Sequence, residues 1–263
     1  MEPLVGRPSV PVLTYNMHVD PEISSKLITL NHVFYQTFAE QFAETRTRLQ
    51  PGVLRILDSV SKDEQILDLG CGNGTLALEL WRRSHQANYI GLDFSPELIS
   101  IANKNMGKKD AQSDRFTFLH EDLATASWEK SLTGKRFDVI LAFAVLHHLP
   151  GSDMRKDVIS KVSAHLPVGG RFIHSNWQFL NSQRLRARIQ PWFNIGLSET
   201  DIEPGDYLLD WRRGGTGLRY VHHFTLEELE ALAQETGFEI LDSFHSDGDG
   251  GRLGLYQIWR RLE

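Results

Sequence analysis

The chain has 263 residues, of which 41% are hydrophobic, so it is long enough to bury a full core in one α/β domain with an extension or insertion. Its single cysteine excludes an internal disulfide and a cysteine-based zinc cluster, and we expect no bound metal. The net charge of −6 argues against a basic coat for nucleic acid, although a local basic patch would still allow RNA to bind.

The first part of the chain carries no signal for a membrane. It lacks a basic-then-apolar targeting segment, and no apolar run approaches the roughly 18 residues that a membrane span needs. We therefore expect a cytoplasmic protein without a membrane partner. Residues 1–24 are punctuated by prolines, which predicts an N-terminal arm or a disordered tail.

A helix is predicted over residues 25–49, because apolar side chains recur there at steps of three and four residues. Tyr35, Phe42 and Arg46 fall on one adjoining face of this helix. Such a face could cover a bound ligand as a lid and hold its carboxylate. A half-buried face with a solvated arginine is the alternative.

Glycine occupies every second position of the turn that follows a short apolar run at residues 66–69. The run is predicted to be a fully buried parallel strand. Gly70, Gly72 and Gly74 let the chain turn sharply and leave room for a ligand at the N-terminus of the next helix. A dinucleotide fingerprint would need its third glycine where Thr75 stands, so the spacing favours a different nucleotide-like ligand. A tight structural turn is the alternative.

Three further strands are predicted at residues 88–93, 116–120 and 137–143. The first of them ends on Asp93, within the roughly 20-residue reach at which an acid binds ribose hydroxyls after such a glycine turn. Phe94 beside it could lie against an adenine ring.

The second half of the chain is predicted to complete the sheet. Thr225 begins a helix with Glu228 in the capping-box position, and an antiparallel strand pair follows around an acidic turn that is too short for a calcium loop. The predicted elements are a helix at 153–166, a strand at 171–176, a helix at 225–235, and strands at 238–244 and 253–259.

Residues 178–220 are predicted to be an insertion on the substrate side. Cations are concentrated there in a chain that is otherwise acidic, namely Arg184, Arg186, Arg188, Arg212, Arg213 and Arg219. They indicate either a phosphate or carboxylate site or a solvated helix face.

The glycine turn with Asp68 before it, and the ordered strand ends, resemble the class I S-adenosylmethionine (SAM)-dependent methyltransferases. The resemblance implies a Rossmann-like α/β fold, with a seven-stranded mostly parallel sheet and a C-terminal antiparallel hairpin, in a single domain over residues 25–263. It also implies SAM as the cofactor, with Asp122 on the adenine amino group. Asp122 alone could equally be an exposed helix cap. The expected cofactor-binding residues are Tyr35, Arg46, Gly70, Cys71, Gly72, Asp93, Phe94, Asp122, Leu123 and Ala142.

A narrower resemblance, to the wobble-uridine tRNA carboxymethyl methyltransferases, rests on residues 34–46, 68–74, 144–148, 205–211 and 218–230. Those enzymes methylate the carboxylate of 5-carboxymethyluridine to a methyl ester, and their eukaryotic members work with a small zinc-containing activator protein. The resemblance therefore implies tRNA and a small activator protein as partners. The chain departs from the family at its leader, which has no counterpart, and at a doubled histidine where one is usual.

The chemistry of methyl transfer suggests two catalytic residues. A carboxylate acceptor is ionised at neutral pH and needs no general base, but it needs a cation to hold it. Arg219 is predicted to be that cation, because a guanidinium binds a carboxylate with two parallel bonds. His147 follows the fourth strand and is predicted to orient the acceptor or to act as a base, whereas His148 is predicted to pack or hydrogen-bond within its loop.

Three functions therefore remain open from the sequence. The first is an RNA carboxyl methyltransferase. The second is a methyltransferase acting on the oxygen or nitrogen of a small molecule, which the low overall basicity favours. The third is a SAM-binding module without catalysis, which the complete set of cofactor residues disfavours.

Overall fold

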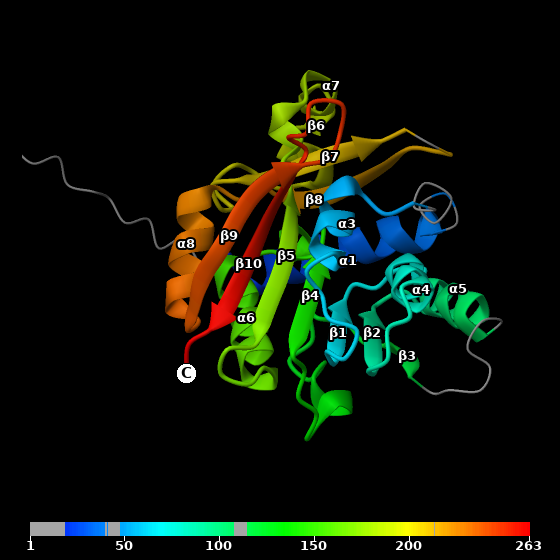
Figure 1. Ribbon diagram of the computed structural model, residues 1–263. Coiled ribbons are helices and arrows are strands. Elements are labelled where there is room, and N and C mark those ends of the chain that lie inside the picture. Colours follow the sequence, from blue (N-terminus) through cyan, green and yellow to red (C-terminus); the bar gives the residue numbers. More distant parts are fainter. Residues whose placement is uncertain (1–18, 40, 42–47, 108–114, 213) are drawn as a thin grey trace, which may run out of the picture.

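The computed structural model describes residues 19–39, 41, 48–107, 115–212 and 214–263, which build a central seven-stranded sheet (Figure 1). Its order is β3-β2-β1-β4-β5-β10-β9. The first five of these strands are parallel, whereas β10 runs antiparallel to both β5 and β9. The predicted fold class is thus confirmed. The strands are β1 (Ile66–Leu69), β2 (Tyr89–Asp93), β3 (Phe116–His120), β4 (Val139–Phe143), β5 (Arg171–Trp177), β9 (Phe238–Ser246) and β10 (Gly254–Arg261).

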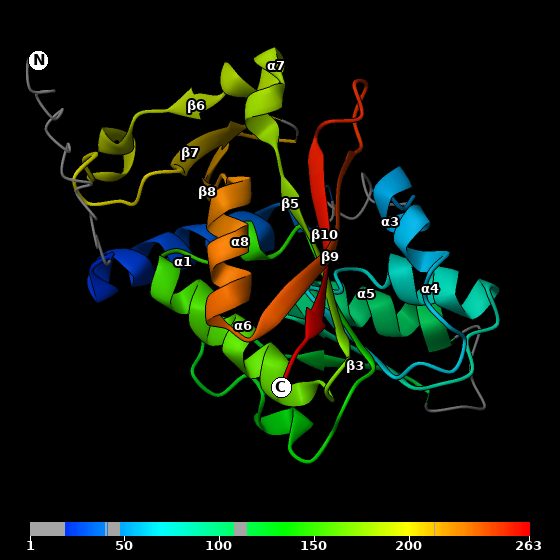
Figure 2. The same cartoon turned by 60° about the vertical axis from the view of Figure 1, so that its left-hand side comes forward.

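Helices cover both faces of this sheet, which explains why every residue of its strands β1 and β2 is buried (Figure 2). One apolar cluster joins one face to α3, α4 and α5, and a second joins the other face to α6 and α8. Ile66 and Leu67 enter different clusters, because successive side chains of a strand point to opposite faces. These helices are α3 (Pro51–Leu57), α4 (Thr75–Arg82), α5 (Pro96–Gly107), α6 (Ser152–His165) and α8 (Leu226–Glu235).

The predicted insertion folds into a second, three-stranded sheet that the sequence did not reveal. Its antiparallel order is β6-β7-β8, and it lies beyond the end of β5 (Figures 1 and 2). Its strands are β6 (Ile189–Gln190), β7 (Asp206–Trp211) and β8 (Gly217–His222), preceded by α7 (Gln183–Arg186). Four short 3-10 helices complete the described elements, namely η1 (Lys130–Leu132), η2 (Leu146–His148), η3 (Phe179–Asn181) and η4 (Trp192–Ile195).

The N-terminal helix α1 (Pro21–Thr37) differs from its prediction at both ends. It begins at Pro21 because Asp20 caps it by accepting the N–H of Glu22 at 2.8 Å, so the expected arm does not extend to residue 24. Residues 48–50 are not helical, which corrects the predicted end at 49. The arm at residues 1–18 and the lid residue Arg46 lie outside the described residues.

Helix α1 packs against β8, which is a strand of the insertion. Leu27 is fully buried in an apolar cluster with Trp192, Leu208 and Tyr220. Among the helices that the structure describes, none is both long and apolar enough to cross a lipid bilayer.

Candidate active site

A cavity of about 450 Å³ opens where β1, β2 and β4 end, at the carboxyl edge of the parallel strands. Open α/β sheets bind their ligands at this edge. The cavity wall includes Gly70 and Asp93 from the sheet, Tyr35 from α1 and Arg219 from β8. Most of the predicted cofactor residues and the predicted acceptor cation therefore face one space.

The glycine turn lines this cavity with Gly70 and Gly72, and each position requires glycine for a different reason. Gly70 has φ +70°, and a Cβ there would lie 2.5 Å from Cγ2 of Val145. Gly72 has φ +56°, but a Cβ there would meet no protein atom within 4 Å. Gly72 therefore leaves open space next to the backbone, as a ligand at the N-terminus of α4 requires. Cys71 lies between them and is buried, which raises the pKa of its thiol.

Asp93, at the end of β2, is held by two backbone groups. Its Oδ2 accepts the N–H of Gly72 at 2.8 Å and its Oδ1 accepts the N–H of Ser95 at 2.9 Å. Burial raises the pKa of Asp93 in spite of these bonds. Each carboxylate oxygen keeps a second lone pair, so Asp93 can still accept bonds from ribose hydroxyls.

Asp68 lies deeper, at the end of β1, and also lines the cavity. It accepts a hydrogen bond from the hydroxyl of Tyr89 at 2.5 Å. Burial raises the pKa of Asp68 to about 7, and the nearby Asp93 adds to this effect. The carboxyl of Asp68 is therefore poised to change its charge near neutral pH.

Phe94 and Asp122, the two predicted adenine contacts, are joined by His32 of α1. The imidazole stacks on Phe94 with a ring separation of 4.7 Å, and its Nε2 lies 3.2 Å from Oδ2 of Asp122. Burial of Asp122 opposes ionisation, but hydrogen bonds from His32 and from the backbone N–H of Ala124 outweigh it and lower the pKa. His32 was not predicted as a site residue, because one histidine on a helix forms no sequence motif.

Ala142 does not fit its predicted role. It is fully buried in the apolar core and is absent from the cavity wall, which includes Phe143 and Ala144 at this strand end instead. Leu123 does line the cavity. Ala142 was misplaced because strand residues point alternately to opposite faces, and the sequence did not show which of the two faced the ligand.

His147 is buried in the wall of the cavity at the end of β4. Its Nδ1 accepts the backbone N–H of Trp177 at 3.3 Å. The neutral ring therefore carries its proton on Nε2, which makes Nε2 a donor rather than a base. The neighbouring His148 hydrogen-bonds through Nε2 to the hydroxyl of Tyr35 at 2.7 Å, so it joins its loop to α1.

Arg219, on β8, is a buried cation surrounded by aromatic rings. Its guanidinium carbon lies 4.7 Å from the ring centre of Trp177, 5.3 Å from that of Phe34 and 5.7 Å from that of Trp211. Among the described residues, its Nε has no hydrogen-bond partner and no acid forms an ion pair with it. Burying a charged group without an anionic partner costs free energy. An anion that enters the cavity could therefore bind this cation.

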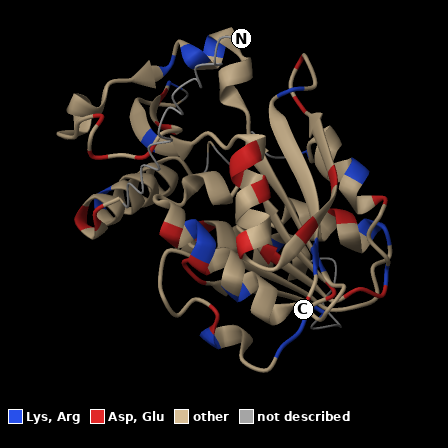
Figure 3. Cartoon of the chain, turned by 90° about the vertical axis from the view of Figure 1, so that its left-hand side faces the viewer, with Lys and Arg blue, Asp and Glu red and all other residues tan. Residues whose placement is uncertain are grey.

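The other arginines of the insertion that the structure describes do not line the cavity. Arg184 and Arg186 are exposed on α7. This helix lies at the outer end of the second sheet (Figure 2), in a region where blue segments mark basic residues (Figure 3). Arg212 is paired with Asp210 at 2.6 Å, and Arg213 lies outside the described residues. Among the described members of this group, Arg219 is therefore the one that the fold brings to the cofactor residues.

Comparison with known proteins identifies the family. A model of the methyltransferase domain matches residues 40–243. The chain belongs to this methyltransferase family. It is a SAM-dependent enzyme, as the glycine turn and the strand ends predicted.

Relatives of this methyltransferase act on different acceptors. It is 26% identical to the tRNA (carboxymethyluridine(34)-5-O)-methyltransferase of Schizosaccharomyces pombe, over 80% of this chain and 89% of that one. It is 29% identical to a ubiquinone biosynthesis O-methyltransferase of Azorhizobium caulinodans, over 68% of this chain but only 60% of that enzyme. A SAM-dependent methyltransferase from Methanosarcina mazei shares the fold with a TM-score of 0.61 at 24% identity, over 81% of this chain and 98% of that chain.

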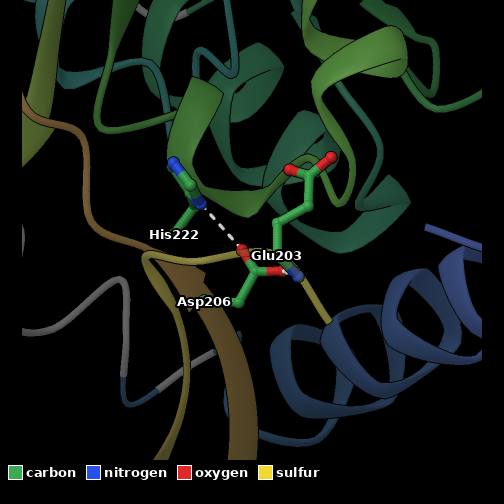
Figure 4. Close-up of side chains that lie close together, drawn as sticks. All are labelled: Glu203, Asp206 and His222. Carbon is green, nitrogen blue, oxygen red and sulfur yellow. Dashed lines mark hydrogen bonds and ion pairs between the residues drawn. The ribbon is translucent and has the colours of Figure 1, made fainter. Parts of the chain in front are cut away.

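The methyltransferase also contains a buried group of Glu203, Asp206 and His222 beneath the second sheet (Figure 4). Nδ1 of His222 lies 2.7 Å from Oδ1 of Asp206, and its Nε2 lies 2.9 Å from Glu228. Burial alone would lower the pKa of His222, but its bonds to Asp206 and Glu228 outweigh burial and raise it.

Arg155 of α6 completes this network by binding Oε2 of Glu203 at 2.6 Å. Glu228, expected to close a capping box, lies 3.4 Å from Arg155 instead, although its N–H is still accepted by Thr225. The acids of this group are thus hydrogen-bonded by Arg155 and His222, and the network joins β7 and β8 to α6 and α8.

Proposed function

We propose that this methyltransferase transfers a methyl group from SAM to a carboxylate held by Arg219, giving a methyl ester, and that the acceptor is a carboxymethyluridine of tRNA. The observation that carries the proposal is Arg219, a buried cation without an acidic partner among the described residues, in the wall of the cavity that also contains the glycine turn. The tRNA methyltransferase of Schizosaccharomyces pombe supports the choice of acceptor.

Several residues of the cavity wall offer groups that suit SAM. The open space at Gly72 admits a ligand against the backbone, and Asp93 retains acceptors for ribose hydroxyls. Phe94 and Asp122 supply an aromatic ring and a carboxylate at the proposed adenine site, where His32 of α1 contacts both of them in this structure. The ring centre of Tyr35, also on α1, lies 5.8 Å from that of Phe94.

The chain's own residues need only bind and orient the acceptor, because bound SAM would supply a methyl group that is attached to a good leaving group. Arg219 holds the carboxylate in two parallel bonds and aligns one oxygen with the methyl carbon. The C–S bond breaks as the O–C bond forms, and the charges of sulfonium and carboxylate cancel, so no proton has to move. His147 donates from Nε2 and can orient the acceptor, which agrees with a reaction that needs no base.

The test is incubation of the protein with methyl-labelled SAM and bulk tRNA, followed by mild alkali. A methyl ester releases labelled methanol under these conditions, whereas methylated amines and ethers do not. Arg219→Lys should be nearly as inactive as Arg219→Ala, because a point charge cannot replace the two-bonded fork. Base-stable label on tRNA would refute the carboxylate acceptor.

A small-molecule hydroxyl or amine is the second candidate acceptor. The ubiquinone-pathway relative and the net charge of −6 favour it. Such an acceptor must lose a proton, and the tautomer of His147 argues against that histidine as the base. Base-stable label in a small-molecule extract, with none in tRNA, would establish this alternative.

A further inference from the structure

Asn31 of α1 behaves like a strand partner for β8. Its side chain is buried, with 4% of its surface exposed. Its Oδ1 accepts the N–H of Tyr220 at 2.9 Å, and its Nδ2 donates to the carbonyl of the same residue at 3.2 Å. Because β7 pairs with only one edge of β8, the amide of Asn31 satisfies the backbone at the other edge, next to Arg219.

The same amide reaches the loop that carries the histidines. Nδ2 of Asn31 also donates to the carbonyl of His148 at 3.3 Å, and the ring of His148 hydrogen-bonds to the hydroxyl of Tyr35 at 2.7 Å. Asn31 thus joins α1 to β8 and to η2, which are far apart in the sequence.

The neighbouring residues of α1 face the cofactor side of the cavity. His32 stacks on Phe94 and pairs with Asp122, and Tyr35 lies against Phe94 with its ring edge. Successive positions of one rigid helix therefore contact the proposed adenine site and the strand of the acceptor cation. A shift of α1 on cofactor binding must move Asn31 as well.

We propose that Asn31 is a positioning residue that couples cofactor binding beneath α1 to the placement of Arg219 on β8. The cofactor would thereby order the acceptor site before the acceptor arrives. The inference rests on the proposed cofactor site but not on the identity of the acceptor.

Hydrogen–deuterium exchange of the full chain, with and without S-adenosylhomocysteine, tests this coupling. In the wild type, the ligand should slow exchange of the β8 amides by about fivefold or more, the lower end of a typical coupling between sites. In Asn31→Ala the ligand should still bind by calorimetry, but the protection of β8 should fall to less than about twofold.

Asn31→Asp sharpens the test because it keeps the shape and the acceptor while removing the donor. Its carboxylate would face the carbonyl oxygens of Tyr220 and His148, so the coupling should also be lost. Thr29→Ala is the matched control, since Thr29 is exposed on α1 and its hydroxyl bonds only to the carbonyl of Ser25 among the described residues. This control should keep the wild-type protection.

Each outcome has a distinct meaning. If S-adenosylhomocysteine does not bind to the wild type, the proposed cofactor site is wrong and the inference falls with it. If the ligand binds but leaves β8 exchange unchanged in the wild type, only the coupling is wrong, whatever the stability of the variants. Full protection of β8 in Asn31→Ala would show that the ligand acts on β8 directly and would also overturn the role of Asn31.

Discussion

Replacing Arg219 with methionine should abolish methyl transfer without destabilising the fold, whereas the same replacement at Arg155 should destabilise it strongly. Both arginines are buried, with exposed fractions of 8% and 1%. Arg155 binds Glu203 at 2.6 Å and also donates to the carbonyl of Leu149 at 3.1 Å. Arg219 has aromatic neighbours instead of acids among the described residues.

The expected magnitudes follow from these partners. Burying an unpaired cation costs several kcal/mol, and contact with an aromatic ring in a desolvated site returns roughly 2 kcal/mol for each ring. With three rings around Arg219, cost and gain nearly cancel, so Arg219→Met should change the free energy of unfolding by less than about 1 kcal/mol. Arg155→Met would leave Glu203 buried without its partner, which should lower the free energy of unfolding by about 3–5 kcal/mol.

Urea unfolding monitored by circular dichroism measures both variants beside the wild type, provided that the slope of the transition stays the same. Methyl transfer to the same acceptor is measured in parallel. If Arg219→Met destabilises the protein as much as Arg155→Met does, then Arg219 is a structural cation and the proposed anion site is wrong. Full activity of Arg219→Met would refute the carboxylate clamp on its own.

Three further predictions concern the cofactor and the base. Asp93→Ala should weaken SAM binding by about 1–3 kcal/mol, because it removes the ribose acceptors and releases the N–H of Gly72; unchanged affinity in calorimetry would reject the assignment. Burial raises the pKa of Asp68 to about 7, and a bound sulfonium favours its ionised form, so SAM affinity should rise from pH 6 to pH 8 by up to about tenfold. Asp68→Asn should flatten that profile in the same titration. His147→Ala should cost less activity than Arg219→Ala in initial-rate assays, and the reverse order would favour an acceptor that needs a base.

The same pKa of Asp68 has a consequence for stability. In the folded state the carboxyl keeps its proton up to about pH 7, whereas in an unfolded chain it loses the proton near its ordinary pKa of 3.8. The folded state therefore binds more protons between these values, and the contribution of Asp68 to stability falls as the pH rises through this range.

The central sheet could be predicted from sequence because buried parallel strands are short, mostly apolar runs and because glycine is favoured where the backbone turns with positive φ. Gly70 and Gly72 both have this conformation. The second sheet could not be predicted in this way. Strand β6 has only two residues, and β8 completes its bonding with Asn31, which lies far back in the sequence. No local pattern encodes such a contact.

The sequence nevertheless indicated that the side chain of Asn31 would be buried. The residue stands between Leu27 and Phe34 at steps of four and three, on the apolar stripe that the helix prediction used. A polar side chain on a buried stripe must find partners, and an amide offers both a donor and an acceptor. The stripe could indicate that Asn31 binds something, but only the fold shows that the partner is the backbone of Tyr220.

Strand β8 explains how the protein can keep an unpaired charge in its cavity. Tyr220 and His222 point to one face of the strand, where they bind Asp206 within the network of Arg155 and Glu203. Arg219 points to the opposite face, toward the cavity. The paired charges on one face fix the strand, so the unpaired charge on the other need not contribute to folding and remains available to an acceptor. A mutation in the network should therefore reduce stability first, and it should change acceptor recognition only through the position of β8.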